Sequence, residues 1–214
     1  MTERVVAFVD GSNLFGGIDE ILKPGQYFKF SEFLTAIEKE IRIDCINFYG
    51  TYMQVDQKDT RKRKLLARTQ KEFFDSTKDT KNLTFYQGHF SKTTGKEKGV
   101  DMHMGIDMVV GACVDTYDTA IIVTGDADLL YAVETTQKFK KTVVMVCLSS
   151  RFPWAIAFKA NHRLVYDLND HFQKTIRPSL GSKLQYLKVI DFHPLLKKVS
   201  DKRTRPPASG GHVG

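Results

Sequence analysis

The chain has 214 residues, 42% hydrophobic and 27% charged, which predicts a packed globular domain with an extension rather than a disordered chain. No apolar run approaches the roughly 18 residues of a membrane-spanning helix, and the first residues lack the basic and apolar regions of a secretory signal. The three cysteines, Cys45, Cys113 and Cys147, form no Cys-x-x-Cys pair. This spacing argues against a disulfide framework or a zinc site, and we expect buried free thiols in a cytoplasmic protein.

The net charge of +7 is concentrated at the C-terminal end of the chain. Residues 174–214 contain nine lysines and arginines against two aspartates, whereas residues 1–173 contain equal numbers of basic and acidic side chains. We therefore expect a neutral domain, 1–173, and a basic extension, 174–214, whose last ~15 residues are predicted to be disordered. Basic arms commonly bind polyanions, and a solvated tail is an equally common interpretation.

Apolar periodicity and turn residues predict strands and helices that alternate along the chain. The first strand, 4–9, leads through Asp10 into a helix that Pro24-Gly25 interrupts. The other expected strands are 43–53, 83–90, 119–124, 142–148 and 163–168, the last of the domain. The other expected helices are 31–41, 56–78, 100–114, 127–139 and 154–160. Ser31 is the predicted N-cap of helix 31–41, with Phe33, Leu34 and Ile37 facing inward. Residues 184–199 are compatible with either a helix or a strand.

Three of the predicted strands, 5–9, 119–123 and 143–148, are continuously apolar. This pattern is typical of strands that are buried on both faces of a parallel sheet. With helices between the strands, it predicts a doubly wound, three-layer α/β/α sandwich with right-handed crossovers. Ligands of such sheets bind at the carboxyl ends of the strands, where the strand order reverses.

Acidic side chains lie where this edge of the sheet is expected. Asp10 follows the first strand, Asp126 and Asp128 follow strand 119–124, and Asp101 opens helix 100–114. An aspartate at a helix N-terminus is ordinarily a cap. Four carboxylates at one edge would, however, repel one another and raise one another's pKa values unless a cation is present. Mg²⁺ and Mn²⁺ bind one or two carboxylates plus waters, so the pattern favours a metal site over simple caps.

Other phosphate-binding and metal-binding motifs fit the sequence less well. No Gly-x-x-x-x-Gly-Lys-[Ser/Thr] and no Gly-x-Gly-x-x-Gly is present, so no nucleotide cofactor is expected. The aspartyl-phosphate motif Asp-x-Asp is excluded because Ser12 stands at its second position. The adhesion-site motif Asp-x-Ser-x-Ser is matched by Asp10 and Ser12 but not by Leu14, so this interpretation ranks second.

Three blocks of the sequence together resemble the signatures of NYN domains, which are PIN-like nucleases that include the LabA-like group. They are FVDGSNL at 8–14, KGVD at 98–101 and IIVTGDADL at 121–129, and the resemblance covers about residues 3–170. It implies a PIN-like, Rossmann-like α/β/α sandwich in residues 1–173. It also implies a Mg²⁺ or Mn²⁺ site made by acidic residues and RNA as the substrate.

Site residues are carried over from this resemblance by motif. The implied metal ligands and catalytic residues are Asp10, Asp101, Asp126 and Asp128. Asn13 and Thr124 would orient a ligand or a water, and Lys98 matches the family's lysine beside the site. Asp107 falls where many members carry an acid, but it lies about 9 Å along the helix axis from Asp101. Pairing with His103 at i,i+4 is an alternative role for Asp107.

The resemblance and the four acids together predict a metal-dependent endoribonuclease that leaves 5′-phosphate and 3′-hydroxyl ends. A divalent cation would neutralise developing charge and lower the pKa of an attacking water. The alternative from another class is a non-catalytic RNA-binding or adhesion module that uses the same acidic edge. We expect RNA to be the binding partner, and we expect no association with a membrane. The sequence is compatible with a homo-oligomer.

Basic residues in two segments are the candidates for RNA binding. In the loop 91–98 they are Lys92, Lys96 and Lys98. In helix 56–78 the candidates are Arg61, Lys64, Arg68 and Lys71, with Leu65, Leu66, Thr69 and Phe73 expected to face inward. For the helix, a solvated outer face is at least as good an interpretation. Tyr27, Phe28 and Phe30 could stack on bases, but a core role is favoured.

Overall fold

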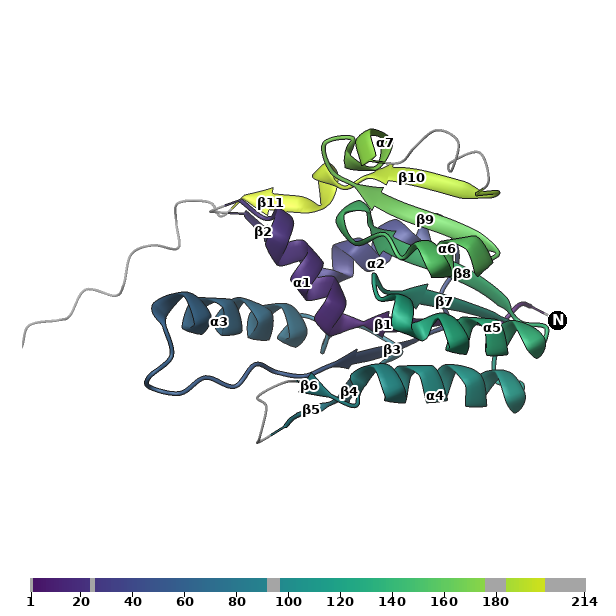
Figure 1. Ribbon diagram of the computed structural model, residues 1–214, viewed down its shortest axis with the longest axis horizontal. Helices are drawn as coiled ribbons and strands as arrows, with labels where there is room; N and C mark the ends of the chain where they lie inside the picture. Colours follow the sequence, from purple (N-terminus) through teal and green to yellow (C-terminus); the bar gives the residue numbers. More distant parts are fainter. Residues whose placement is uncertain (1, 24–25, 92–96, 176–183, 199–214) are drawn as a thin grey trace, which may run out of the picture.

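A parallel sheet forms the centre of the computed structural model, which describes residues 2–23, 26–91, 97–175 and 184–198. The sheet has seven strands in the order β10-β9-β8-β7-β1-β3-β4, and every neighbouring pair is parallel. Helices cover both faces (Figure 1). The predicted α/β/α sandwich is therefore confirmed. In the described ranges, no helix has the length and apolar character needed to cross a membrane.

Six of the seven strands of the main sheet correspond to the predicted strands, and β10 is added to them. The strands are β1 (Val5–Asp10), β3 (Cys45–Gly50), β4 (Leu83–Gln87), β7 (Thr119–Val123), β8 (Thr142–Leu148), β9 (His162–Asp167) and β10 (Leu187–Asp191). Two short antiparallel pairs lie outside it. One joins β2 (Gln26–Phe28) to β11 (Leu196–Lys198), and the other joins β5 (His89–Phe90) to β6 (Glu97–Lys98).

Each face of the sheet packs against its own set of helices. One hydrophobic core lies under α1 (Gly11–Ile21), α2 (Phe30–Glu38) and α3 (Arg61–Asp75). The other core lies under α4 (Val100–Cys113), α5 (Leu130–Lys138) and α6 (Trp154–Lys159). The remaining helical segments are η1 (Ala127–Leu129), η2 (Ser149–Arg151), α7 (His171–Thr175) and η3 (His193–Leu195). Strands β7 and β8 are buried almost throughout, as their apolar runs predict.

The strand order reverses beside β1. From β1 the chain continues to β3 and β4 on one side, and β7 then returns to pair with β1 on the other side. The carboxyl ends of β1 and β7 therefore flank the switch point, where ligands of doubly wound sheets bind. Asp10 ends β1 there, and Thr124 directly follows β7.

The start of α2 differs from the prediction. Helix α2 begins at Phe30 with Lys29 as its N-cap, so Ser31 is not the cap. Phe30 is 1% exposed and packs edge-on against Phe48, which places it in the first helical turn. Phe33, Leu34 and Ile37 are buried as predicted, and Phe28 and Phe30 are core residues, whereas Tyr27 is partly exposed.

The predicted strand 83–90 is in fact two strands separated by Gly88. The N–H of Gly88 donates to the Gly50 carbonyl, and a Cβ at this position would lie 2.4 Å from Thr51 Oγ1. The chain therefore turns away from the sheet after β4 and forms the β5–β6 pair. This pair brings residue 97 and the start of α4 to the carboxyl edge.

The buried face of α3 is rotated relative to the prediction. Leu65 is 64% exposed and does not face inward, whereas Phe73 and Phe74 are buried. Gln70 is also buried because its side-chain oxygen accepts the Met53 N–H at 2.7 Å. A polar residue with a buried backbone partner cannot be recognised from apolar periodicity alone.

The C-terminal segment contributes strands beyond the predicted boundary at residue 173. Strand β10 pairs with β9, so the predicted strand 163–168 is not the last, and β11 pairs with β2. Phe192 between them is fully buried and stacks on Phe28. The predicted disorder of the last residues concerns 199–214, which lie outside the described residues.

The cysteines differ partly from the expectation. All three are free thiols, but only Cys147 is buried, while Cys45 and Cys113 are exposed. Cys45 opens β3 and Cys113 ends α4, and positions at the ends of elements are less covered than those inside strand β8.

Candidate active site

Asp10 is the buried acid at the switch point, with 2% of its surface exposed. Its Oδ1 accepts the Asn13 N–H at 2.9 Å, so Asp10 caps α1, and its Oδ2 accepts the Thr124 hydroxyl at 3.1 Å. Burial, with smaller contributions from the charges of Asp101 and Glu97, raises the pKa of Asp10 to about 7. Asp10 is therefore an N-cap through its Oδ1, as the cap interpretation expects. The same carboxyl group also has two acidic neighbours, Asp101 and Glu97.

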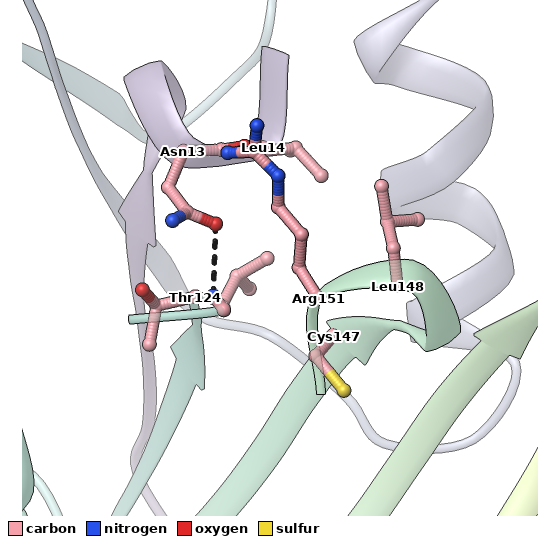
Figure 2. Close-up of a pocket in the computed structure, with 8 residues that line it drawn as sticks. Asn13, Leu14, Thr124, Cys147, Leu148 and Arg151 are labelled. Carbon is pink, nitrogen blue, oxygen red and sulfur yellow. Dashed lines mark hydrogen bonds between the residues drawn. The ribbon is translucent and has the colours of Figure 1, made fainter. Parts of the chain in front are cut away.

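The loop after β7 is tied to Asp10 and to α1 by consecutive hydrogen bonds. Thr124 Oγ1 accepts the Asp126 N–H at 3.0 Å, and Asp126 Oδ1 accepts the Asp128 N–H at 3.0 Å. Asn13 Oδ1 accepts the Gly125 N–H at 2.9 Å (Figure 2). These bonds fix the backbone of 124–128, while Asp126 remains half-buried and Asp128 exposed.

Asp101 reaches the same edge from the first turn of α4. The preceding Gly99 has φ +86°, a left-handed conformation that glycine adopts without strain and that starts the helix abruptly. Partial burial raises the pKa of Asp101, and the charges of Asp126, Glu97 and Asp128 raise it as well. Asp101 also raises the pKa of Asp10, so Asp101 interacts electrostatically with Asp10 as well as with Asp126 and Asp128.

Glu97 is a fifth acid at this edge that the motifs did not identify. Its Oε1 accepts the Ser12 hydroxyl at 2.8 Å, and Ser12 Oγ accepts the Thr51 N–H at 3.4 Å. Glu97 therefore lies beside the turn that follows Asp10. Its position four residues before Asp101 and next to Lys98 is a signal that could have suggested it.

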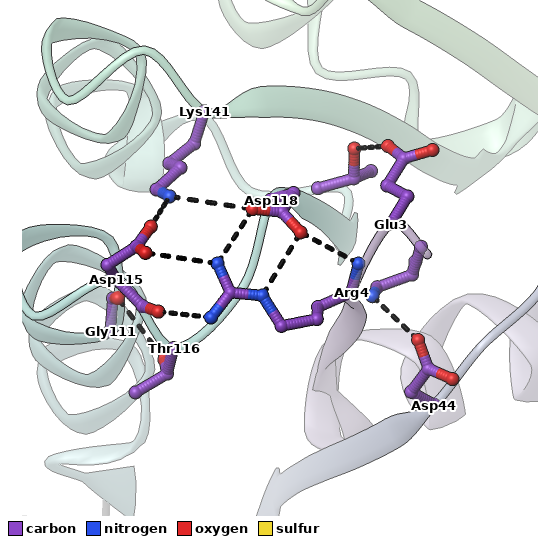
Figure 3. A network of polar contacts seen from close by, with 10 residues as sticks. Glu3, Arg4, Asp44, Gly111, Asp115, Thr116, Asp118 and Lys141 are labelled. Atoms are coloured by element: carbon purple, nitrogen blue, oxygen red, sulfur yellow. Dashed lines mark hydrogen bonds and ion pairs between the residues drawn. The ribbon is translucent and has the colours of Figure 1, made fainter. Parts of the chain in front are cut away.

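The acids at the two edges of the sheet have different surroundings. At the amino edge, Asp115 and Asp118 form ion pairs with Arg4 at 3.2 and 2.7 Å, and Lys141 also pairs with Asp115 (Figure 3). These cations hold the pKa values of both aspartates below their usual range. By contrast, no lysine or arginine in the described part of the chain forms an ion pair with the carboxyl-edge acids Asp10, Glu97, Asp101, Asp126 or Asp128.

The donor chemistry of the carboxyl edge fits a hard divalent cation. Its charge is negative, its ligand atoms are carboxylate, hydroxyl and amide oxygens, and Mg²⁺ needs only one or two carboxylates because waters complete its shell. Within the described ranges, no group of three or more His, Cys, Asp or Glu side chains is placed so that it could hold a metal ion. Waters would therefore have to complete the shell of any cation bound at this edge.

Two further predicted site residues, Lys98 and Asp107, lie on β6 and α4. Lys98 is exposed on β6, next to Glu97. Asp107 lies farther along α4 and accepts the Tyr49 hydroxyl at 2.9 Å. No hydrogen bond or ion pair joins Asp107 to His103, both of which are described. The expected pairing with His103 is therefore wrong, because the Asp107 carboxylate faces β3.

The predicted RNA-binding residues of α3 are exposed but partly neutralised. Arg68 pairs with Glu72 at 3.0 Å, and Lys64 Nζ donates to the Gln57 carbonyl at 2.7 Å. Arg61, in the first turn, is exposed. Lys71, the fourth candidate on this helix, pairs with Asp75. Lys92 and Lys96 lie outside the described residues.

A small pocket of about 10 Å³, about the size that holds one water, adjoins the loop after β7. Asn13, Thr124, Gly125 and Arg151 contribute to its lining (Figure 2). Arg151 comes from η2, after β8, and no sequence motif singled it out. An arginine in a short connection has no periodicity that would mark it.

Comparisons with known proteins identify the family and agree with the fold. The family model of the NYN domain matches residues 4–166. A crystal structure of a protein of unknown function from Vibrio parahaemolyticus has the same fold, with a TM-score of 0.53 and 16% sequence identity. The match covers 79% of this chain and 95% of that chain. The search of curated proteins found no match. The NYN model spans the sheet from β1 to β9 and includes all four predicted acids, and the chain therefore belongs to the NYN domain family.

Proposed function

We propose that the chain is a metal-dependent endoribonuclease that hydrolyses RNA to 5′-phosphate and 3′-hydroxyl ends. The observation that carries the proposal is the buried Asp10 at the switch point of an NYN fold, with Asp101 and Glu97 near enough to raise its pKa and with no lysine or arginine of the described chain paired to these acids. Structural acids are ordinarily paired, as those at the amino edge are. Unpaired acids at a ligand-binding edge indicate a functional site.

Asp10, Asp101, Asp126 and Asp128 are the residues that would hold Mg²⁺ or Mn²⁺, with Glu97 beside them. When bound, the cation supplies neutralisation of the phosphodiester charge and lowers the pKa of a water. Thr124 orients Asp10 by donating to its Oδ2, and the same hydroxyl oxygen fixes the backbone of Asp126. The chain thereby holds two of its acids with one side chain.

RNA binding requires cations around this acidic edge. Lys98, exposed next to Glu97, would contact a phosphate beside the acids, and Lys92 and Lys96 belong to the same loop by sequence. Arg61, Lys64 and Arg68 of α3 would form a second group of phosphate contacts. We place α3 second because Arg68 already pairs with Glu72. The 2′-hydroxyl takes no part in this hydrolysis, so the preference for RNA rests on the family.

The chemistry of the product ends tests the proposal. A uniformly labelled RNA pool is incubated with the protein and Mg²⁺ or Mn²⁺, and the products are treated with a 5′-phosphate-dependent exonuclease. Hydrolysis directed by the acids predicts that every fragment downstream of a cut carries a 5′-phosphate and is degraded. Ends with 2′,3′-cyclic phosphate, formed equally well in EDTA, would overturn the proposal. RNA binding without cleavage would favour the alternative of a binding module.

A further inference from the structure

Arg151 binds both the first and the last turn of α1. Its Nη1 donates to the Asn13 carbonyl at 3.1 Å, and its Nε and Nη2 donate to the two carboxylate oxygens of Glu20 at 3.2 and 2.5 Å. The guanidinium thus holds α1 at two positions, two turns apart. Figure 2 shows the side chain extending from the β8 end of the sheet up to Asn13.

Three glycines make room for this side chain. A Cβ at Gly16 would lie 2.9 Å from Arg151 Nη1, and one at Gly17 would lie 3.2 Å from Arg151 Cδ. On the other side, a Cβ at Gly125 would lie 2.6 Å from both the Cβ and the carbonyl oxygen of Arg151. All three distances are shorter than ordinary contacts. Arg151 is therefore seated between α1 and the loop that carries Asp126.

The bond between Asn13 and Gly125 determines the orientation of the Asn13 amide. Because a backbone N–H needs an acceptor, the oxygen of the amide must face Gly125, and the nitrogen must face away. In Figure 2 the nitrogen of the Asn13 amide points away from the dashed hydrogen bond that its oxygen makes. Asn13 Nδ2 has no hydrogen-bond partner among the described residues. Asn13 follows Asp10 by three residues, so this nitrogen is a donor beside the acidic edge.

We propose that Arg151 is a positioning residue that holds Asn13 so that Nδ2 donates to a non-bridging phosphate oxygen of the RNA. The inference rests on the proposed ribonuclease function and adds a residue that the NYN motifs do not contain. Arg151 acts through Asn13 and Gly125, because its Nη1 holds the Asn13 carbonyl and its side chain packs against the position of Gly125, while its Nε and Nη2 are bound to Glu20. A direct phosphate contact by Arg151 is the competing interpretation, and it would not depend on Asn13.

A double-mutant cycle between Arg151 and Asn13 tests this coupling. Arg151→Gln is expected to lower kcat by about tenfold or more and to change KM by less than about twofold, since misplacing a catalytic group affects kcat most. In an Asn13→Ala background the same substitution should cause no further loss. Glu20→Gln is the matched control, because it removes the charge of the pair but leaves the bond to Asn13, and it should stay within about twofold of the wild type.

Two outcomes of the cycle contradict the inference. An equal loss from Arg151→Gln in both backgrounds would mean that Arg151 does not act through Asn13. An equal loss from Glu20→Gln would mean that the ion pair, rather than the bond to Asn13, is what matters. If Arg151→Gln does not fold, Arg151→Lys decides the matter, since lysine can still donate to the Asn13 carbonyl. It should recover much of the wild-type kcat, and failure to do so in a folded protein would count against the inference.

Amide hydrogen exchange separates this inference from the proposed function. In Arg151→Gln the Gly125 N–H should exchange at least about tenfold faster than in the wild type, while Glu20→Gln leaves it protected. If this holds but the wild type cleaves no RNA, the positioning role stands and the ribonuclease proposal fails. If the wild type cleaves RNA but Gly125 exchange is unchanged in Arg151→Gln, the positioning role is wrong and the ribonuclease proposal survives.

Discussion

At the scale of single residues, Asp10 connects the local structure most directly to a measurable property. Its pKa is raised to about 7, chiefly because it is buried, so the native state binds this proton more tightly than the unfolded chain does. The stabilising contribution of the proton is therefore fully present below about pH 4. It is lost as the pH rises through about 7.

Asp10→Asn should remove this pH dependence. Asparagine can still accept the Asn13 N–H and can donate to the Thr124 hydroxyl, so the two local bonds are retained. In EDTA, the free energy of unfolding of the wild type should fall by up to about 4 kcal/mol more than that of the variant between about pH 4 and pH 8. Denaturant unfolding at several pH values measures this. Asp79→Asn, an exposed acid before β4, is the control and should keep the wild-type slope.

Parallel slopes for wild type and Asp10→Asn would contradict the raised pKa. They would mean that the Asp10 carboxyl group is solvated or paired in solution, and that its burial does not raise its pKa.

At the scale of elements, the contact between α1 and β3 determines where Asp10 and Asn13 lie. Gly11 opens α1, and a Cβ there would lie 2.1 Å from the ring of Phe48 and 2.8 Å from the Tyr49 carbonyl oxygen. Phe48 is fully buried and cannot move aside freely. Gly105 in α4 is different, because its Cβ would make ordinary contacts of 3.5 and 3.6 Å with Ala132 and Leu129.

Gly11→Ala and Gly105→Ala therefore form a matched pair. Gly11→Ala should destabilise the protein by about 1–3 kcal/mol through overpacking and should also reduce RNA cleavage, because it displaces the start of α1. Gly105→Ala should be neutral or stabilise by up to about 1 kcal/mol, since alanine is the better residue within a helix. Thermal unfolding of both variants provides the measurement. If Gly11→Ala were as stable as Gly105→Ala, the close approach of α1 to β3 would be incorrect.

The elements that the sequence predicted best are those whose pattern does not depend on distant partners. The apolar strands β7 and β8 have nearly the predicted bounds, and the motif acids follow strand ends because the topology requires it. The predictions from sequence are wrong where a tertiary contact determines the start of an element or its buried face. Phe30 enters α2 because it packs on Phe48, and Gln70 is buried on α3 because it binds Met53 N–H.

The candidate site could be predicted only as far as its motifs extend. The four acids come together as the alternating strands imply. Glu97 and Arg151 were missed because each reaches the site through a local feature, the β5–β6 pair and the glycine-lined seat on α1. Neither feature has a periodicity or a spacing that identifies it in one sequence.

At the scale of the whole molecule, the distribution of charge predicts where non-specific RNA affinity originates. Residues 1–173 are neutral overall, and residues 200–214 include Lys202, Arg203 and Arg205 against Asp201. Each lost phosphate contact lowers the salt slope of single-strand binding by about 0.7. Deleting 200–214 should therefore reduce this slope by up to about two and weaken apparent binding, while cleavage at saturating RNA is retained.

Binding across a salt series for the full-length and truncated chains measures this effect. Unchanged slopes would mean that Lys98 and its loop, or α3, hold the RNA. A loss of turnover at saturating RNA would contradict the assignment of the reaction to the carboxyl edge of the sheet alone.

We propose that the carboxyl-edge acids, which form no ion pair within the described residues, act together with a divalent cation to cleave RNA. The variant Asp126→Asn tests this proposal, because asparagine caps a helix as well as aspartate does and should leave the metal-free protein at least as stable as the wild type.

The measurement is the rate of RNA cleavage by wild type, Asp126→Asn and Asp79→Asn, each with Mg²⁺ or Mn²⁺ and with EDTA. We expect cleavage by wild type and Asp79→Asn only with the cation, and a loss of at least about 100-fold in Asp126→Asn. Cleavage by a folded Asp126→Asn at the wild-type rate, or wild-type cleavage that persists in EDTA, would contradict this proposal.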